Sequence, residues 1–316
     1  MKNRSAPGLS GLRRTLALIL AAVLGTGLLA ACGSSEARSL LTSIRNGHVI
    51  AGTKYDQPGL GVREPDKEIT GFDADVSRYV VSSIAKKLGV PEPEISWKET
   101  PSAQRENLIS NGEVDMIAAT YSINDSRSKR VDFGGPYLVT YQALLVRADD
   151  NQLQTLEDMN AGRRLCSVTG STSAQNVQKQ LPAVQLQQFD SYSSCVEAVY
   201  REKVDALTTD ATILAGFAAQ YPGEFKLVEM NNVSDVMGDD GKVSKKAGSP
   251  FSTERYGIGV TKGDKATVDA INEALDEMIS SGAWNEAFMR NVGNSMRDSG
   301  YPVPEPPTPG DLSFLS

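Results

Sequence analysis

The side chains that could carry out catalysis are few in this 316-residue sequence. His48 is its single histidine, so a Ser-His-Asp or Cys-His arrangement would have to use that residue. Its place before an apolar segment is typical of a surface residue at the start of a strand. No cysteine and histidine spacing fits a metal site, and no glycine motif fits a nucleotide. The sequence therefore predicts no metal, cofactor or catalytic residue of these kinds, and only a carboxylate acid–base pair stays open.

Arg127 suits the binding of a small anion better than it suits catalysis. The planar guanidinium can form two parallel hydrogen bonds to one carboxylate. Its neighbours Lys129 and Arg130 are also basic, so spacing alone favours a solvated arginine on a helix surface. The two interpretations stay open at this point.

The first 31 residues have the pattern of an export signal. A basic leader with Arg13-Arg14 precedes an apolar run over residues 15–31, which is short for a membrane span. Leu29-Ala30-Ala31-Cys32 resembles the lipobox of bacterial lipoproteins, which implies cleavage before Cys32 and a lipid on its sulfur. An uncleaved membrane anchor is the alternative, and the Sec and Tat export routes both stay open.

The formal net charge is −7, and no basic stripe is present, so nucleic-acid binding is not expected. Cleavage would remove Lys2, Arg4, Arg13 and Arg14 and no acidic residue. An acidic body gains nothing from anionic lipid. We therefore expect the acyl chain on Cys32 and the polar tether at 32–39 to hold the protein at the outer face of the cell membrane.

Cys166 and Cys195 are the two cysteines that remain after the leader. A lone pair in an exported protein favours a disulfide, which would stabilise the fold by roughly 3–4 kcal/mol. Two separate buried thiols are the alternative.

Strand-like and helix-like segments alternate along the chain in two similar series. The first series runs from the strand at 48–53 to the strand at 139–146, and the second from the strand at 164–168 to the strand at 204–207. A strand at 257–260 and an amphipathic helix at 268–281 follow. This repetition predicts an α/β fold with two lobes. The proline-rich residues 301–309 should be extended and poorly ordered.

Seven motifs resemble, in the same order, the polar-amino-acid solute-binding proteins of ABC importers. They are the strand at 48–53, Gly71-Phe72-Asp73-Ala74-Asp75, Asn111-Gly112-Glu113-Val114-Asp115, Ser122-Ile123-Asn124-Asp125-Ser126-Arg127, Phe133-Gly134-Gly135-Pro136-Tyr137, Val168-Thr169-Gly170-Ser171-Thr172 and Tyr256-Gly257-Ile258-Gly259-Val260. The resemblance covers roughly residues 45–293. The segment Gly52–Gly59 and the cysteine pair are most similar to the glutamate-binding branch of actinobacterial importers.

This resemblance implies a periplasmic-binding-protein-like fold with two lobes joined by hinge strands. Lobe 1 would be 40–141 plus 255–293, lobe 2 would be 142–254, and 294–316 would form a tail. The ligand would lie in the cleft, which closes by hinge motion. The implied partners are an amino acid (glutamate, with aspartate or glutamine open) and the permease subunits of the importer, bound by a monomer.

The resemblance also assigns roles to residues beside the cleft. Arg127 would clamp the α-carboxylate and Asp210 would pair with the α-ammonium, although Asp210 could instead cap the following helix. Thr120 and Ser122 would bind both groups, although the family has glycine at the position of Thr120. Further contacts are implied at the start of a helix, where capping is the alternative: Thr169, Ser171 and Thr172. The family's basic residue before that loop is absent.

Specificity for an acidic side chain would come from Lys54, where acidic-amino-acid binders of the family carry a cation. An exposed lysine at a strand end is the alternative. Arg105 is a second candidate cation, unless it faces solvent on its helix. Tyr121, with Tyr55 and Tyr137, would line the aliphatic part of the ligand or pack in the core.

Asp73 and Asp75 form a tempting carboxylate pair, but we expect Asp75 to cap a helix and neither residue to touch ligand. Two other functions stay open on the same fold. A dehydratase-type enzyme would need the acid–base pair, and a sensor lipoprotein signalling to a membrane kinase would bind its ligand in the same way.

Overall fold

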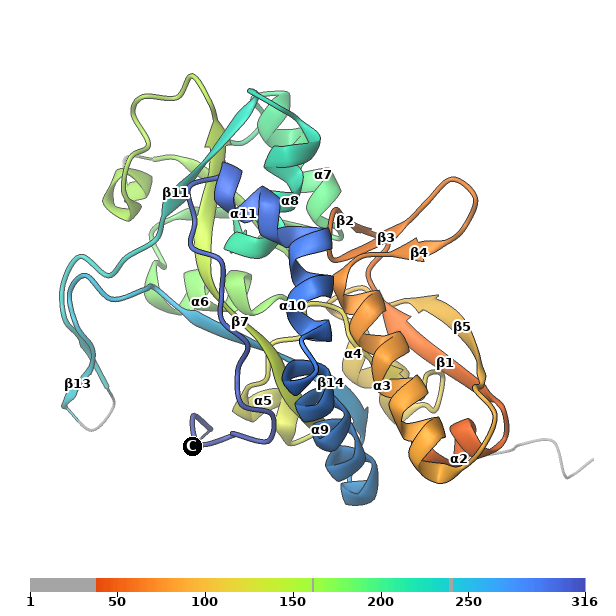
Figure 1. Cartoon of the computed structure of the whole chain (residues 1–316). Helices are drawn as coiled ribbons and strands as arrows, with labels where there is room; N and C mark the ends of the chain where they lie inside the picture. The colour runs from red at the N-terminus through yellow and green to blue at the C-terminus, as the bar shows by residue number, and fades with distance from the viewer. Residues whose placement is uncertain (1–37, 161, 239–240, 316) are drawn as a thin grey trace, which may run out of the picture. The chain divides into compact units, whose positions relative to one another are not determined.

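The computed structural model describes residues 38–160, 162–238 and 241–315 (Figure 1). The helices are α2 (Leu40–Arg45), α3 (Phe72–Leu88), α4 (Arg105–Ser110), α5 (Asp125–Ser128), the 3-10 turn η1 (Leu156–Asn160), α6 (Thr172–Gln180), α7 (Tyr192–Tyr200), α8 (Ala211–Gln220), α9 (Lys265–Ser280), α10 (Ala283–Phe288), the π-turn η2 (Met289–Gly293) and α11 (Asn294–Asp298). The strands are β1 (His48–Thr53), β2 (Asp56–Gln57), β3 (Gly61–Arg63), β4 (Ile69–Thr70), β5 (Glu94–Glu99), β6 (Met116–Ile117), β7 (Val131–Arg147), β8 (Arg164–Val168), β9 (Gln185–Phe189), β10 (Ala206–Asp210), β11 (Phe225–Glu229), β12 (Val236–Met237), β13 (Val243–Lys245) and β14 (Thr253–Thr261).

The main sheet has two halves that share the long strand β7. Its order is β5-β1-β6-β14-β7-β10-β8-β9, with β11 also on β7. Residues 131–141 of β7 pair with β14, and residues 142–147 pair with β10 and β11. We call β5, β1, β6 and β14 with their helices the β1 half, and β10, β8, β9 and β11 with theirs the β8 half. Within each half the neighbouring strands β1, β5 and β6, or β8, β9 and β10, are parallel.

Helix α3 covers the β1 half because one of its faces is apolar. Val76, Val80 and Ile84 recur at helical spacing and are buried. The helix starts at Gly71, where φ is +113° and an added Cβ would lie 2.3 Å from the Leu60 carbonyl oxygen, so only glycine fits. The turn before the helix is thereby held against the chain that follows β1.

The disulfide between Cys166 and Cys195 is present, with the two Cα atoms 5.9 Å apart. It joins β8 to α7, and both cysteines are fully buried. The prediction that Asp75 caps a helix is wrong, since Asp75 lies inside the first turn of α3 and its side chain does not cap that helix. Its carboxylate instead accepts hydrogen bonds from Arg290 and Asn291, since the helix start is occupied by glycine.

The proline-rich tail is extended, but the prediction that it is poorly ordered is wrong. Tyr301 and Val303 pack against the main core, and the Gly310 amide donates to the Gly135 carbonyl at 2.7 Å. Apolar residues after the prolines, Leu312 and Phe314 among them, pack on a second core cluster. Composition alone could not show these distant docking sites.

Cys32 and the rest of the leader lie outside the described residues, so the structure does not address the lipid anchor. Within the described ranges, no helix combines the length and apolar character needed to cross a membrane. The same ranges contain no cluster of histidine, cysteine and acidic residues suited to a metal ion.

Candidate functional site

The candidate ligand residues come together where strands of both halves end. Lys54 follows β1, and Thr120, Tyr121 and Ser122 follow β6 in the β1 half. In the β8 half, residues 169–172 follow β8, and Asp210 is the last residue of β10. Ligands of open α/β sheets bind outside the carboxyl ends of the parallel strands. The placement therefore gives a candidate binding site between the two halves.

Three cationic side chains are buried at this site. Lys54, Arg105 and Arg127 are 4%, 2% and 5% exposed. The alternative that these side chains face solvent is therefore wrong for all three. The Lys54 Nζ donates to Ser102 Oγ at 2.9 Å. An Arg105 NH group donates to the Ala119 carbonyl at 2.9 Å, and the guanidinium lies over the Tyr121 ring.

Burial, together with the charge of Arg105, lowers the pKa of Lys54 to about 7. Burial also lowers the pKa of Arg105 to about 10, with a contribution from the charge of Arg127. Only Arg127 of the three forms an ion pair among the described residues, with Glu106 at 3.3 Å. Buried positive charges that lack ion-pair partners favour the binding of an anion that can pair with them.

Arg127 also reaches across the site. Its guanidinium donates to the Ser122 carbonyl at 2.6 Å and to the Gly170 carbonyl at 3.0 Å. Ser122 Oγ lies 3.4 Å from Thr172 Oγ1, so the same two loops meet at a second point. Farther out, the Asp56 carboxylate accepts hydrogen bonds from the Ser193 amide and hydroxyl. The structure thus shows the two halves in contact around the site.

Asp210 lies on the β8 half of the site, at the end of β10, and is 3% exposed. Its carboxylate accepts hydrogen bonds from Tyr256 Oη at 2.6 Å and from Ser173 Oγ at 3.4 Å. Although Asp210 precedes α8, its side chain does not cap that helix. Burial raises the pKa of Asp210 to about 8, and the charge of Glu254 adds to this effect. A cation placed here would restore the charge of the carboxylate.

The remaining predicted residues divide between the site and local structure. Thr120 is buried with φ +46°, and its amide donates to the buried Asp73 carboxylate at 2.8 Å. Ser171 caps α6 by accepting from the Ala174 amide, which bears out the capping alternative for its side chain. Thr169 is exposed, at the rim rather than inside the site.

Buried polar atoms without a hydrogen-bond partner lie on two of the predicted residues, Arg105 (Nε) and Tyr121 (Oη). Others lie on residues that the sequence analysis missed: Thr53 (Oγ1), Gln57 (Nε2) and Thr209 (Oγ1). Gln57 is fully buried, and its Oε1 lies 3.2 Å from Thr120 Oγ1. Such atoms cost free energy unless a ligand or water satisfies them. Position offered a signal, because Thr53 and Thr209 flank Lys54 and Asp210.

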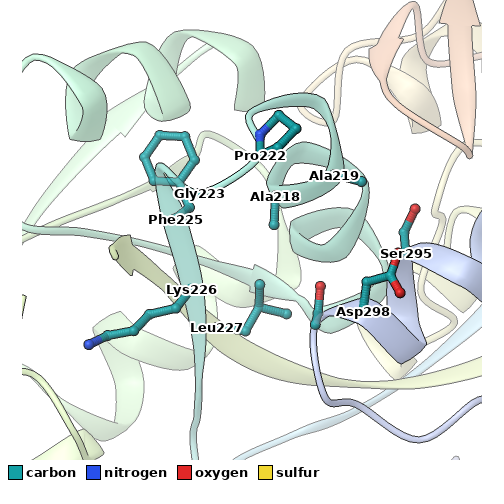
Figure 2. Close-up of a pocket in the computed structure, with 10 residues that line it drawn as sticks. Ala218, Ala219, Pro222, Gly223, Phe225, Lys226, Leu227, Ser295 and Asp298 are labelled. Carbon is teal, nitrogen blue, oxygen red and sulfur yellow. The ribbon is translucent and has the colours of Figure 1, made fainter. Parts of the chain in front are cut away.

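An opening of about 260 Å³ lies over the Arg127 side of the site, between Ala103, Thr169 and Gly170. A larger pocket of about 370 Å³ lies elsewhere, between α8, β11 and α11 (Figure 2). It contains none of the candidate ligand residues and only one cation, Lys226, whose amine donates to the Asp150 carbonyl. The site with the three buried cations is therefore better suited to an anionic ligand than this pocket is.

Comparison with known proteins places this chain among relatives that cover nearly its whole length. Residues 49–294 match the family described as bacterial extracellular solute-binding proteins, family 3. The glutamate-binding protein GluB of Corynebacterium efficiens is 55% identical over 96% of this chain and 97% of its own length. The ABC transporter glutamine-binding protein GlnH of Bacillus subtilis is 31% identical over 88% of this chain and 97% of its own. A solved structure of an ancestral arginine-binding protein bound to glutamine superposes with a TM-score of 0.64, at 28% identity, over 78% of this chain and 98% of that one.

Proposed function

Because this chain belongs to the bacterial extracellular solute-binding proteins of family 3, we propose that it binds glutamate between its two halves and delivers it to an ABC importer. The observation that carries the proposal is the group of three buried cations, Lys54, Arg105 and Arg127. Glutamate brings two carboxylates and one ammonium, which match this group and the buried carboxyl group of Asp210. The named relatives are binding proteins, which favours binding over catalysis.

In this proposal Arg127 binds the α-carboxylate with the amides near Ser171 and Thr172, and Asp210 binds the α-ammonium. Lys54 and Arg105 bind the side-chain carboxylate, since both are buried on the β1 half. Ser122, Thr120 and Tyr121 complete the wall of the site.

The two lobes would be 40–141 plus 255–293, and 142–254. The change of pairing partner along β7 between Tyr141 and Gln142 supports this division. Ligand binding would stabilise the closed arrangement, since Arg127 and Ser122 contact the β8 half directly.

The chain would act outside the membrane as a monomer, held by a lipid on Cys32. The sequence Leu29-Ala30-Ala31-Cys32 and the extracellular character of the family support this location. Permease subunits of the importer would be the partners of the closed form.

Calorimetric titration of the chain from Gly33 onward tests the proposal, because all described core residues lie within it. We expect glutamate to bind more tightly than aspartate and glutamine. Lys54→Met keeps most of the volume but removes the charge, and should weaken glutamate binding about 100-fold or more. Lys86→Met, on the exposed face of α3, is the matched control. Equal affinity for glutamine, or normal glutamate binding by K54M, would contradict the proposed specificity.

A further inference from the structure

Tyr256 connects the ammonium end of the site to the strand that returns the chain to the β1 half. It lies on β14, is fully buried, and its hydroxyl donates to Asp210 Oδ2 at 2.6 Å. We infer that Tyr256 is a positioning residue for amino-acid recognition, which holds the Asp210 carboxyl group in place and favours its ionised form for the ligand's ammonium. This inference rests on the proposed binding of an amino acid.

The hydrogen bond from Tyr256 is the shortest that the Asp210 carboxylate accepts within the described residues. The other contact, from Ser173 Oγ, is long at 3.4 Å. Thr212 Oγ1 lies 3.2 Å from the Tyr256 hydroxyl. Because the single tyrosine proton goes to the carboxylate, the threonine is the donor in that second bond. Thr212 thereby fixes the direction in which the tyrosine hydroxyl points.

The charges around Asp210 explain why a donor is needed there. Burial and the charge of Glu254, two residues before Tyr256 on β14, both oppose ionisation of the carboxyl group. Tyr256, Ser173 and the charge of Arg127 favour it, and Tyr192 lies within electrostatic reach from α7. Without the Tyr256 hydroxyl, Asp210 should keep its proton to a higher pH. A neutral carboxyl group pairs poorly with an ammonium group.

A second tyrosine with the same chemistry offers an internal comparison. Tyr137 lies on β7, its hydroxyl donates to Asp73 at 2.7 Å, and its ring centroid is 6.1 Å from that of Tyr256. Both tyrosines are fully buried. Only Tyr256 contacts Asp210, so Tyr137→Phe removes an equivalent hydroxyl without touching that carboxylate.

The experiment compares the wild type, Tyr256→Phe and Tyr137→Phe in the chain from Gly33 onward. The pKa of Asp210 is measured without ligand by NMR of ¹³C-labelled aspartate, assigned with Asp210→Asn. We expect the pKa of Asp210 to rise in Y256F and to stay unchanged in Y137F. Glutamate affinity of Y256F at pH 7 should fall about 10- to 100-fold, and the loss should shrink toward pH 9.

An unchanged Asp210 pKa in Y256F, or an affinity loss that is the same at every pH, would overturn the inference and leave Tyr256 a packing residue. The two proposals can fail separately. If the wild type binds no amino acid, the proposed function fails, and the ligand role of Tyr256 fails with it. The ligand-free titration still decides whether Tyr256 controls the Asp210 carboxylate.

Discussion

Lys54 is a cation whose charge depends on the site around it. Its pKa is about 7 because burial and Arg105 oppose the charge, while Asp56 and Glu99 favour it only partly. Glutamate can bind Lys54 well only when the amine is protonated, whereas glutamine places a neutral amide beside it. The difference between the two ligands should therefore depend on pH.

We predict that the ratio of glutamate to glutamine affinity falls as the pH rises from 7 to 9. Above its pKa of about 7 the free protein has lost the Lys54 proton, and glutamate must restore it on binding. The cost approaches tenfold in affinity per pH unit. Titration of both ligands at pH 6, 7, 8 and 9 measures the ratio, to which Asp210 contributes equally in both cases. Parallel curves for the two ligands, or the same slope in K54M, would rule out this role.

Asp210 should reduce the stability of the ligand-free protein at neutral and higher pH. Its folded-state pKa of about 8 lies above the usual value, so the stability that its proton contributes is lost as the pH rises through 8. Asp210→Asn cannot titrate. We expect its Tm to exceed that of the wild type by a few degrees at pH 8, with little difference at pH 4, and amino-acid binding to be lost.

Asp205 provides a control of opposite sign for this measurement. Burial would raise its pKa, but the hydrogen bonds and charge of Arg164 outweigh that effect and lower it. Asp205→Asn should therefore lower the Tm at pH 8. If D210N and D205N shifted the Tm in the same direction, the ionisation of Asp210 would not destabilise the folded protein as the structure indicates.

At the scale of elements, the loop after β8 closes on the start of α4. Gly170 has φ +77°, and an added Cβ would lie 2.6 Å from the Ala103 Cα. The same loop accepts a hydrogen bond from Arg127 through the Gly170 carbonyl. Glycine therefore permits the contact between the two halves at this point.

We predict that Gly170→Ala weakens glutamate binding about tenfold or more, because the added methyl opposes the closed arrangement. Gly223→Ala is the matched control, since its φ is +81° and nothing lies within 4 Å of the added Cβ. Both variants share the cost of a left-handed alanine, about 1 kcal/mol. Titration calorimetry with glutamate compares them, and equal affinities would show that the loop does not limit closure.

The sequence predicted the elements of the site better than the contacts between them. Lys54 and Asp210 could be predicted to converge because each follows a strand, and parallel strands end at one edge of a sheet. The roles of Gln57 and Tyr256 could not, since each depends on a partner far away in the chain: Thr120 for one and Asp210 for the other. The prediction that Asp75 caps a helix is wrong, because Gly71 occupies the cap position of α3 and Asp75 lies inside the first turn.

At the scale of the whole described chain, the C-terminal segment contacts both halves. Helix α10 packs on α3 and α9 in the β1 half, and α11 packs on α8 in the β8 half. The tail then returns beside β7 to the β1 half, seen as the dark blue segment leading to the C-terminus (Figure 1). Gly310 and Phe314 fix its end there, through Gly135 and Arg255.

We predict that Phe314→Ala destabilises the folded protein by about 1 kcal/mol, which lowers the Tm by a few degrees. The half-buried ring packs on the cluster that includes Tyr121 and Phe133, and the Arg255 guanidinium lies 4.5 Å from its centroid. Ser313→Ala is the matched control, because Ser313 is exposed and its amide and side chain bond only the exposed Asp311 among the contacts described. Thermal unfolding compares the two, and amide hydrogen exchange should show faster exchange after Gly310 in F314A alone. If both variants melt with the wild type, the tail does not contribute to stability, and its contacts with the β1 half are dispensable in solution.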